Sequence, residues 1–274
     1  MLLLSAPFDP AAAALPRAPL RPFAQTGGVA ALVVALGAAS EMLGAVPTGL
    51  GRALATGAAH GGLIGLGWLL ATGGAPGWTG PVIRIGMVMT LASVAARLGP
   101  WGALAFALTP LLLLLEARRR PALRALGLVG CRLRHALAGL AAGGFLGAHL
   151  LITASLTFGH RAHASSLETY ALALAYDVGA NALSAEWLFR GAVFSWCWRR
   201  SSFWPAALVS TALALLRYLV DPALPHAVEA WAGAVFYLGL VGLIACALRA
   251  WSGSLLPGYL AGLAFFAAYR SLAP

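Results

Sequence analysis

Long apolar tracts separated by short polar segments dominate the chain, and they predict helices that cross a membrane. Each tract is close to the roughly 20 residues that a helix needs to span a bilayer. The predicted spans cover about 28–46, 53–72, 80–97, 101–116, 136–158, 167–198, 205–220, 229–249 and 253–270. The expected fold class is therefore all-α, a polytopic transmembrane bundle of about eight or nine helices. The sixth tract is the longest, and a bend within it would change the count.

The polar segments between the tracts predict how the chain is oriented. Residues 1–27 are rich in proline and carry Arg17 and Arg21, so we expect an irregular or interfacial segment on the cytoplasmic side. Further arginines lie at 118–120, 124, 132, 134, 199, 200 and 249. Because basic loops stay in the cytoplasm, this pattern places the amino end inside and the carboxy end outside.

Composition supports a membrane protein and argues against a nucleic-acid partner. Hydrophobic residues make up 61% of the chain and charged residues only 9%, whereas a soluble domain carries about 25% charged residues. The net charge of +10 comes from arginines that lie between apolar tracts and form no basic stripe. We therefore expect a multi-pass protein of the cell inner (plasma) membrane, with membrane lipids as its surroundings. The basic loop 118–134 orients the protein, or it forms a site for lipid headgroups or for a partner.

The sixth tract carries two sets of polar residues. At α-helical spacing, one face presents Tyr170, Asp177, Asn181 and Ser184. Glu186 and Arg190 fall on roughly the opposite face, four residues apart with the acid first, which favours an ion pair. Because a helix with two polar faces cannot lie against lipid, we expect it at the centre of the bundle.

The seventh tract adds Arg217 and Asp221. Counted from a turn near Ser202, Glu186 lies sixteen positions before and Arg217 fifteen after, so both lie about 23 Å from the tip. The hairpin therefore predicts one polar layer that contains Glu186, Arg190 and Arg217. Asp221, Asn181 and Asp177 complete the predicted layer. Such a layer either binds an anionic peptide terminus or lipid headgroup, or fixes helix register as a structural ion-pair network.

We predict no metal and no cofactor. His160 and His163 lie in an outer loop, and their spacing is not the helical spacing that mounts two ligands on one face. A solvated loop explains them better than a metal site does, and the same holds for His226. The three cysteines form no Cys-x-x-Cys pair.

Tryptophans lie mostly near the ends of the predicted spans. They are Trp187, Trp196, Trp198, Trp204, Trp231 and Trp251. Because tryptophan is enriched at membrane–water interfaces, we interpret this set as interfacial anchors.

The stretch Ala185-Glu-Trp-Leu-Phe-Arg-Gly191 resembles the first motif of the CPBP intramembrane proteases, usually Glu-Glu-x-x-x-Arg-Gly. This family comprises the type II CAAX prenyl endopeptidases and the bacteriocin-processing group. Its second motif, Phe-x-x-x-His, would fall on 213–217, and its third, Gly-Ser-Leu-x-x-Pro-x-x-x-His, within 253–262. The resemblance covers about 167–270. It implies a CPBP-like helical core at 136–274, preceded by an N-terminal membrane region at 1–135 with about four spans and the basic cytoplasmic loop.

The chain departs from the family at the residues that would activate water for peptide hydrolysis. The first glutamate is replaced by Ala185, the two histidines by Arg217 and Gly262, and a later asparagine by Phe266. Glu186 and Arg190 are then the remnant of the catalytic motif. A carboxylate held beside guanidiniums is stabilised as the anion, which makes it a weak general base.

The resemblance and its departures imply a non-catalytic scaffold or assembly subunit that binds a membrane-protein or peptide partner. The alternative is an active intramembrane endopeptidase that uses Glu186 to process a membrane peptide or protein. The sequence alone does not decide whether the protein is an enzyme. The replaced catalytic positions favour a protein that is not an enzyme. A third hypothesis, a small transporter, finds no support because we see no paired inverted repeat.

Overall fold

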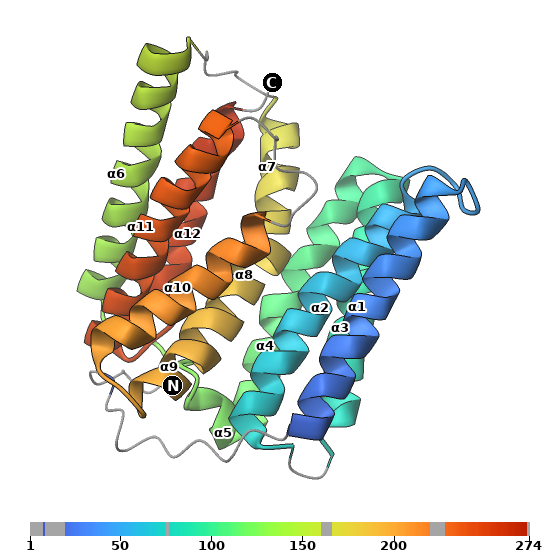
Figure 1. Cartoon of the computed structure of the whole chain (residues 1–274), viewed down its shortest axis with the longest axis horizontal. Helices are drawn as coiled ribbons and strands as arrows, with labels where there is room; N and C mark the ends of the chain where they lie inside the picture. Colours follow the sequence, from blue (N-terminus) through green and yellow to red (C-terminus); the bar gives the residue numbers. More distant parts are fainter. Residues whose placement is uncertain (1–7, 9–19, 75–76, 160–165, 220–227, 273–274) are drawn as a thin grey trace. The chain divides into compact units, whose positions relative to one another are not determined.

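The computed structural model describes residues 8, 20–74, 77–159, 166–219 and 228–272, and within them the chain forms helices and no strands (Figure 1). The predicted all-α class is confirmed. In the first half, the elements are α1 (Leu20–Met42), α2 (Leu50–Thr72), α3 (Thr79–Leu98), η1 (Pro100–Ala107), α4 (Leu108–Arg119), α5 (Pro121–Arg124) and α6 (Leu133–Phe158). In the second half, they are α7 (Leu167–Tyr176), η2 (Asp177–Asn181), α8 (Ala182–Ala185), η3 (Glu186–Phe194), α9 (Ser195–Trp198), α10 (Phe203–Leu219), α11 (Val228–Ser252), α12 (Leu256–Tyr269) and η4 (Arg270–Leu272).

Among the described residues, six helical segments are long and apolar enough to cross a membrane. They are α1, α2, α3, η1 joined to α4, most of α6, and Ala232–Ser252 of α11. The apolar helix α10 is shorter, and the tract 167–198 is divided into five consecutive pieces. The protein is a multi-pass membrane protein.

The first helix begins earlier than the proline content of 1–27 predicts. Helix α1 starts at Leu20, so the expectation of irregular structure is wrong for residues 20–27. Pro22 lies in the first turn, where a helix has no intrahelical N–H bond to lose. The helix ends at Met42, five residues before Pro47. Residues 1–7 and 9–19 lie outside the described part of the chain.

The chain divides into two compact units that interleave along the sequence. Unit 1 comprises 1–14, 126–165 and 189–274, and unit 2 comprises 15–125 and 166–188. The division falls within η3, between Leu188 and Phe189, so the predicted motif contributes residues to both units. The assignment of 1–135 and 136–274 as separate regions followed from the resemblance and stays a prediction.

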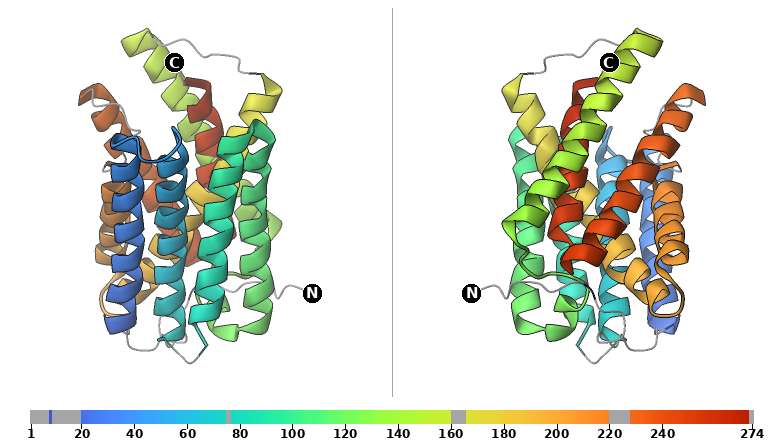
Figure 2. Two further views of the ribbon diagram at one scale, coloured as in Figure 1. Left: turned by 90° about the vertical axis from the view of Figure 1, so that its right-hand side faces the viewer. Right: turned by 90° about the vertical axis from the view of Figure 1, so that its left-hand side faces the viewer.

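In unit 1, α6 packs closely against α12 through glycines spaced one turn apart (Figure 2). A Cβ atom at Gly139 would collide with the carbonyl group of Pro257, and one at Gly143 with that of Ala261. Small residues at every fourth position let two membrane helices bring their backbones together. The glycines therefore set the distance between these two helices.

Unit 2 is organised around α2, which packs on both α1 and α3. Helix α3 in turn packs on η1, and η1 contacts α7. The buried side of α2 includes Ile64, Trp68 and Leu69, none of which is exposed. The side chains of α1 are mostly exposed, as expected for the outer helix of such a unit in lipid. Unit 2 thus surrounds α2 with helices from both parts of its sequence.

Labelling of Cys131 tests the predicted orientation. This residue lies between α5 and α6, and its burial raises the pKa of its thiol although a backbone hydrogen bond from Ala136 opposes the shift. In a Cys197→Ser/Cys246→Ser background, an impermeant maleimide should modify Cys131 only from the cytoplasmic side. Because the thiolate is the nucleophile, modification at pH 7 should be slower than at an ordinary cysteine and should accelerate about tenfold per pH unit below the pKa.

The matched control for this experiment is Ser202→Cys with Cys131→Ser in the same background. Ser202 is exposed in the turn after α9, and the sequence places that turn on the same side of the membrane. Modification of Cys131 in intact cells from outside would contradict the orientation. Equal rates for the two thiols at pH 7 would contradict the effect of burial.

Candidate functional site

The sixth tract contains two π-helical stretches, η2 and η3, with one α-helical turn between them. A π-helix bonds each carbonyl to the fifth residue along, one further than an α-helix, and such stretches occur frequently at functional sites. The α-helical spacing that assigns two polar faces therefore does not hold across the tract. The Asp177–Asn181 stretch and the Glu186–Arg190 motif each fall within a π-helical stretch.

The predicted polar residues of unit 2 form a buried chain of hydrogen bonds. The Nδ2 atom of Asn181 donates to Oδ1 of Asp177 at 2.9 Å. The hydroxyl of Ser184 donates to the backbone carbonyl of Asn181 at 3.3 Å. All three side chains are buried, whereas Tyr170 is half-buried. The structure thus brings together three of the four residues that the sequence places on one face.

His60 is a polar residue of this network that the sequence analysis missed. It lies in α2, is only 3% exposed, and bonds Ser184 Oγ through Nδ1 and Tyr176 Oη through Nε2, each at 2.8 Å. The signal for it was present, because His60 is the one titratable residue of the 53–72 tract. A solitary histidine inside a predicted span indicates a polar partner elsewhere in the bundle.

Trp187 is an internal anchor, which contradicts its interpretation as an interfacial residue. Its side chain is fully buried, and its Nε1 donates to the carbonyl of Ile64 in α2 at 2.9 Å. A Cβ at Gly67 would lie 2.5 Å from this nitrogen, so the indole lies directly against the α2 backbone. By contrast, Trp204 and Trp251 are 65% and 44% exposed. Trp187 therefore fixes the start of η3 to α2.

Glu186 and Arg190 are both buried, at 5% and 4% exposure. On the unit 1 side, the guanidinium of Arg190 reaches the neighbourhood of Gly242 in α11 and Thr211 in α10. A Cβ at Gly242 would lie 2.6 Å from Arg190 Nη2 and 3.0 Å from Thr211 Oγ1. A buried guanidinium is costly without polar surroundings, and the glycine leaves room for it. Ala185, at the position of the family's first glutamate, is also buried.

Arg217 lies near the end of α10, where it is half-buried and its Cζ lies 4.3 Å from the ring centroid of Tyr218. Ser210 ties α10 to η3 by donating to the carbonyl of Phe189 at 2.8 Å. Asp221 lies outside the described residues. Glu186 belongs to unit 2 and Arg217 to unit 1, and their meeting in one layer stays a prediction.

The third motif builds a turn between α11 and α12. Gly253 has a positive φ of 67°, and Ser254 donates to the carbonyl of Val129 at 2.6 Å. Gly262 and Phe266, at the positions of the family's second histidine and its asparagine, are buried in α12. In this chain the motif therefore ties the turn to the segment before α6.

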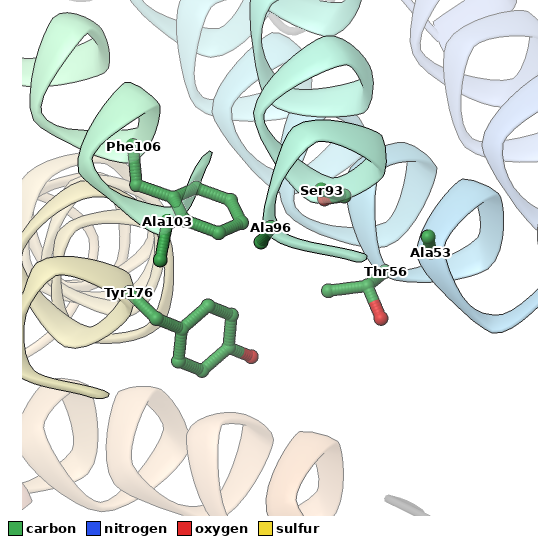
Figure 3. A pocket seen from close by; sticks show the side chains of 7 residues that line it. All are labelled: Ala53, Thr56, Ser93, Ala96, Ala103, Phe106 and Tyr176. Carbon is green, nitrogen blue, oxygen red and sulfur yellow. The ribbon is translucent and has the colours of Figure 1, made fainter. Parts of the chain in front are cut away.

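Unit 2 also contains a pocket of about 210 Å³. It is lined by Ala53, Thr56, Ser93, Ala96, Ala103, Phe106 and Tyr176 (Figure 3). Across the described residues, no three His, Cys, Asp or Glu side chains lie close enough to hold a metal ion. His160, His163 and His226 lie outside the described residues.

These features define a multi-pass helical membrane protein with a charged motif buried in a π-helical stretch. Residues 167–265 match the family model described as type II CAAX prenyl endopeptidase Rce1-like. This match confirms the resemblance over the segment that runs from α7 into α12, and it identifies a membrane protein with a CAAX-protease-like segment. No curated protein and no solved structure matches the chain.

Proposed function

We propose that this protein binds a membrane-protein or peptide partner through its CAAX-protease-like segment and does not cleave it. The proposal rests mainly on the residues that stand where the family has the side chains that would activate water for peptide hydrolysis. Ala185, Arg217 and Gly262 stand where the family has one glutamate and two histidines. None of the three can accept a proton from water at neutral pH, as a general base must.

The surroundings of these positions support the same proposal. Ala185 and Gly262 are buried within packed helices. Glu186 is retained, and it shares η3 with the buried Arg190. Two buried charged side chains in one motif serve to position helices or to receive a polar group of a partner. We place the protein in the cell inner (plasma) membrane, with the loop 118–134 in the cytoplasm.

Cleavage assays with a Glu186→Gln variant test whether the segment is catalytic. In liposomes that contain prenylated CAAX peptides and other fluorogenic membrane peptides, we expect wild type and variant to give the same background product. The substitution keeps the size of the side chain and removes its capacity to accept a proton as a base. Product from wild type that falls at least tenfold in the variant would instead establish the endopeptidase alternative.

Purification tests the binding part of the proposal. Wild-type protein extracted from its native membrane in mild detergent should retain one partner at a fixed stoichiometry after two chromatographic steps. The partner should be lost in a Gly242→Leu variant that still folds, because the larger side chain displaces Arg190. A matched Gly233→Leu variant should keep it, because nothing lies near that glycine. A partner-free protein in mild detergent would contradict the proposal.

A further inference from the structure

Arg199 in unit 1 is a cation whose hydrogen-bond donors are buried without a partner among the described residues. It directly follows Trp198, the last residue of α9, and its side chain is half-buried. Its Nε, Nη1 and Nη2 atoms are all buried, and none of them bonds to a described residue. A guanidinium has several N–H donors and no acceptor, and buried donors are costly when they are left unsatisfied. Arg199 is therefore suited to a ligand that accepts hydrogen bonds.

Two further guanidinium groups add positive charge near Arg199. Burial, and then the charge of the adjacent Arg200, lower the pKa of the Arg199 guanidinium. Arg249 in α11 is buried, donates to the carbonyl of Gly253, and is close enough for the charge of Arg199 to act on it. Among the described residues, no carboxylate acts on Arg199 in the opposite direction. Like charges repel each other most strongly where water is excluded, so the cluster favours an anion.

The structure around Arg249 is closely packed. Its Cζ lies 4.7 Å from the ring centroid of Phe8, and that ring stacks on Trp198 at 5.2 Å. The backbone N–H of Phe8 donates to the carbonyl of Ala250 at 3.0 Å. A Cβ at Gly127 would lie 2.5 Å from Arg249 Nη1. All of these residues belong to unit 1, so the position of Arg249 beside α9 is set within one unit.

The shape and the place of the cluster favour a phosphate group. A planar guanidinium matches the oxygens of phosphate and of carboxylate. A carboxylate has its oxygens in one plane, whereas phosphate directs oxygens to several sides and can face cations that come from different helices. Arg199 and Arg249 come from the end of α9 and from α11. The sequence places both on the cytoplasmic side, where the headgroups of anionic lipids attract basic residues.

We propose that Arg199 binds a phosphate group at the predicted cytoplasmic surface of unit 1, with Arg200 and Arg249 adding positive charge around it. Arg199 supplies the hydrogen bonds, because its donors are the ones without a described partner. A phospholipid headgroup and free phosphate share this chemistry, and the experiment below distinguishes them. The proposal does not depend on the partner proposed for the motif at Glu186.

Thermal unfolding of the full chain with added phosphate ligands tests the proposal. The protein is purified in a nonionic detergent without phosphate or phospholipid, and the transition temperature is followed against inorganic phosphate and dihexanoyl phosphatidylglycerol. Sodium chloride at equal ionic strength and dihexanoylglycerol, which lacks the phosphate, are the controls. A ligand that binds the folded state stabilises it, so a phosphate ligand should raise the transition to a saturating value and the controls should not. An effect of the lipid at lower concentration identifies a phospholipid as the source, and otherwise the source is free phosphate.

Three variants test whether Arg199 carries the binding. Arg199→Gln should weaken the apparent affinity at least about tenfold, as expected for lost charge-assisted hydrogen bonds. Without ligand its transition should be no lower than that of wild type, because a buried charge is removed. The matched control Arg200→Gln should change the affinity less than about threefold, since Arg200 is exposed and donates to the carbonyl of Trp196. Arg199→Lys keeps the charge but not the planar donors, so it should also bind more weakly, and it tests the site if Arg199→Gln does not fold.

Several results would overturn the proposal. They are no shift with either phosphate ligand, an equal shift with sodium acetate, and equal affinities of wild type and the Arg199 variants. Asp9 follows Phe8 in the sequence and is a possible competitor for the site. A shift that appears only in an Asp9→Asn variant would mean that a carboxylate of the chain occupies the place of the phosphate, and this too would overturn the proposal.

Discussion

Replacing Gly143 with leucine should prevent stable folding of the protein in detergent. A Cβ at this position would collide with the carbonyl group of Ala261, and a leucine would force α6 and α12 apart along their contact. Overpacking of a well-packed core typically costs about 1–3 kcal/mol, and here the obstacle is backbone that cannot rotate away. We expect a loss of at least about 3 kcal/mol, measured as loss of the monodisperse species and of the thermal unfolding transition.

The adjacent glycine provides the matched control. Gly144 is exposed on the same helix, and nothing lies within 4 Å of a Cβ built on it. Gly144→Leu should be neutral or stabilise the helix by up to about 1 kcal/mol, because glycine is a poor helix former. Two neighbouring substitutions of the same kind should therefore have opposite signs. Comparable yields for Gly143→Leu and Gly144→Leu would contradict the close packing of α6 on α12.

Replacing Trp187 with alanine should cause the second large loss of stability. The indole is fully buried, donates to the carbonyl of Ile64, and lies against the backbone at Gly67. Large-to-alanine substitutions of buried aromatic residues cost about 3–5 kcal/mol in soluble proteins. Within lipid the transfer part of this cost is smaller, since lipid is also apolar. We therefore expect about 2–4 kcal/mol, measured by denaturation in mixed micelles.

Two further tryptophan variants distinguish the effect of burial from the effect of the indole N–H donor. Trp204→Ala should cost less than about 1 kcal/mol, because that side chain is 65% exposed. Trp187→Phe should show an intermediate loss, since it keeps most of the packing and removes the N–H donor. If Trp187→Ala and Trp204→Ala destabilise equally, Trp187 does not anchor η3 to α2.

Hydrophobic tract length predicts the helices of this protein well, because lipid leaves the backbone few alternatives to helix. The limits of α3 and α6 lie within a few residues of the apolar tracts. Proline content misleads at α1, because its effect depends on whether the ring lies in the first turn or further along. The two π-helical stretches were not predicted, since an extra residue in a turn depends on packing against other elements.

In the candidate site, too, features that depend on neighbouring residues in the sequence were predicted, whereas contacts between residues far apart in the sequence were not. Burial of Glu186 and Arg190 follows from their place in an apolar tract, and the structure finds both buried. The bond between His60 and Ser184 joins residues 124 positions apart, and no local pattern encodes such a contact. Trp187 was misplaced for the same reason, because its partner Ile64 lies on a distant helix.

The π-helical form of η3 has a consequence for the direction in which Glu186 points. A π turn holds about one residue more than an α turn, and η3 runs for nine residues from Glu186 to Phe194. Each residue added to or removed from such a stretch changes the rotation between the residues before and after it by about 100°. A one-residue deletion between Glu186 and Phe194 would therefore turn the carboxylate toward another side of the helix relative to the residues that follow, whereas a substitution of equal size would not.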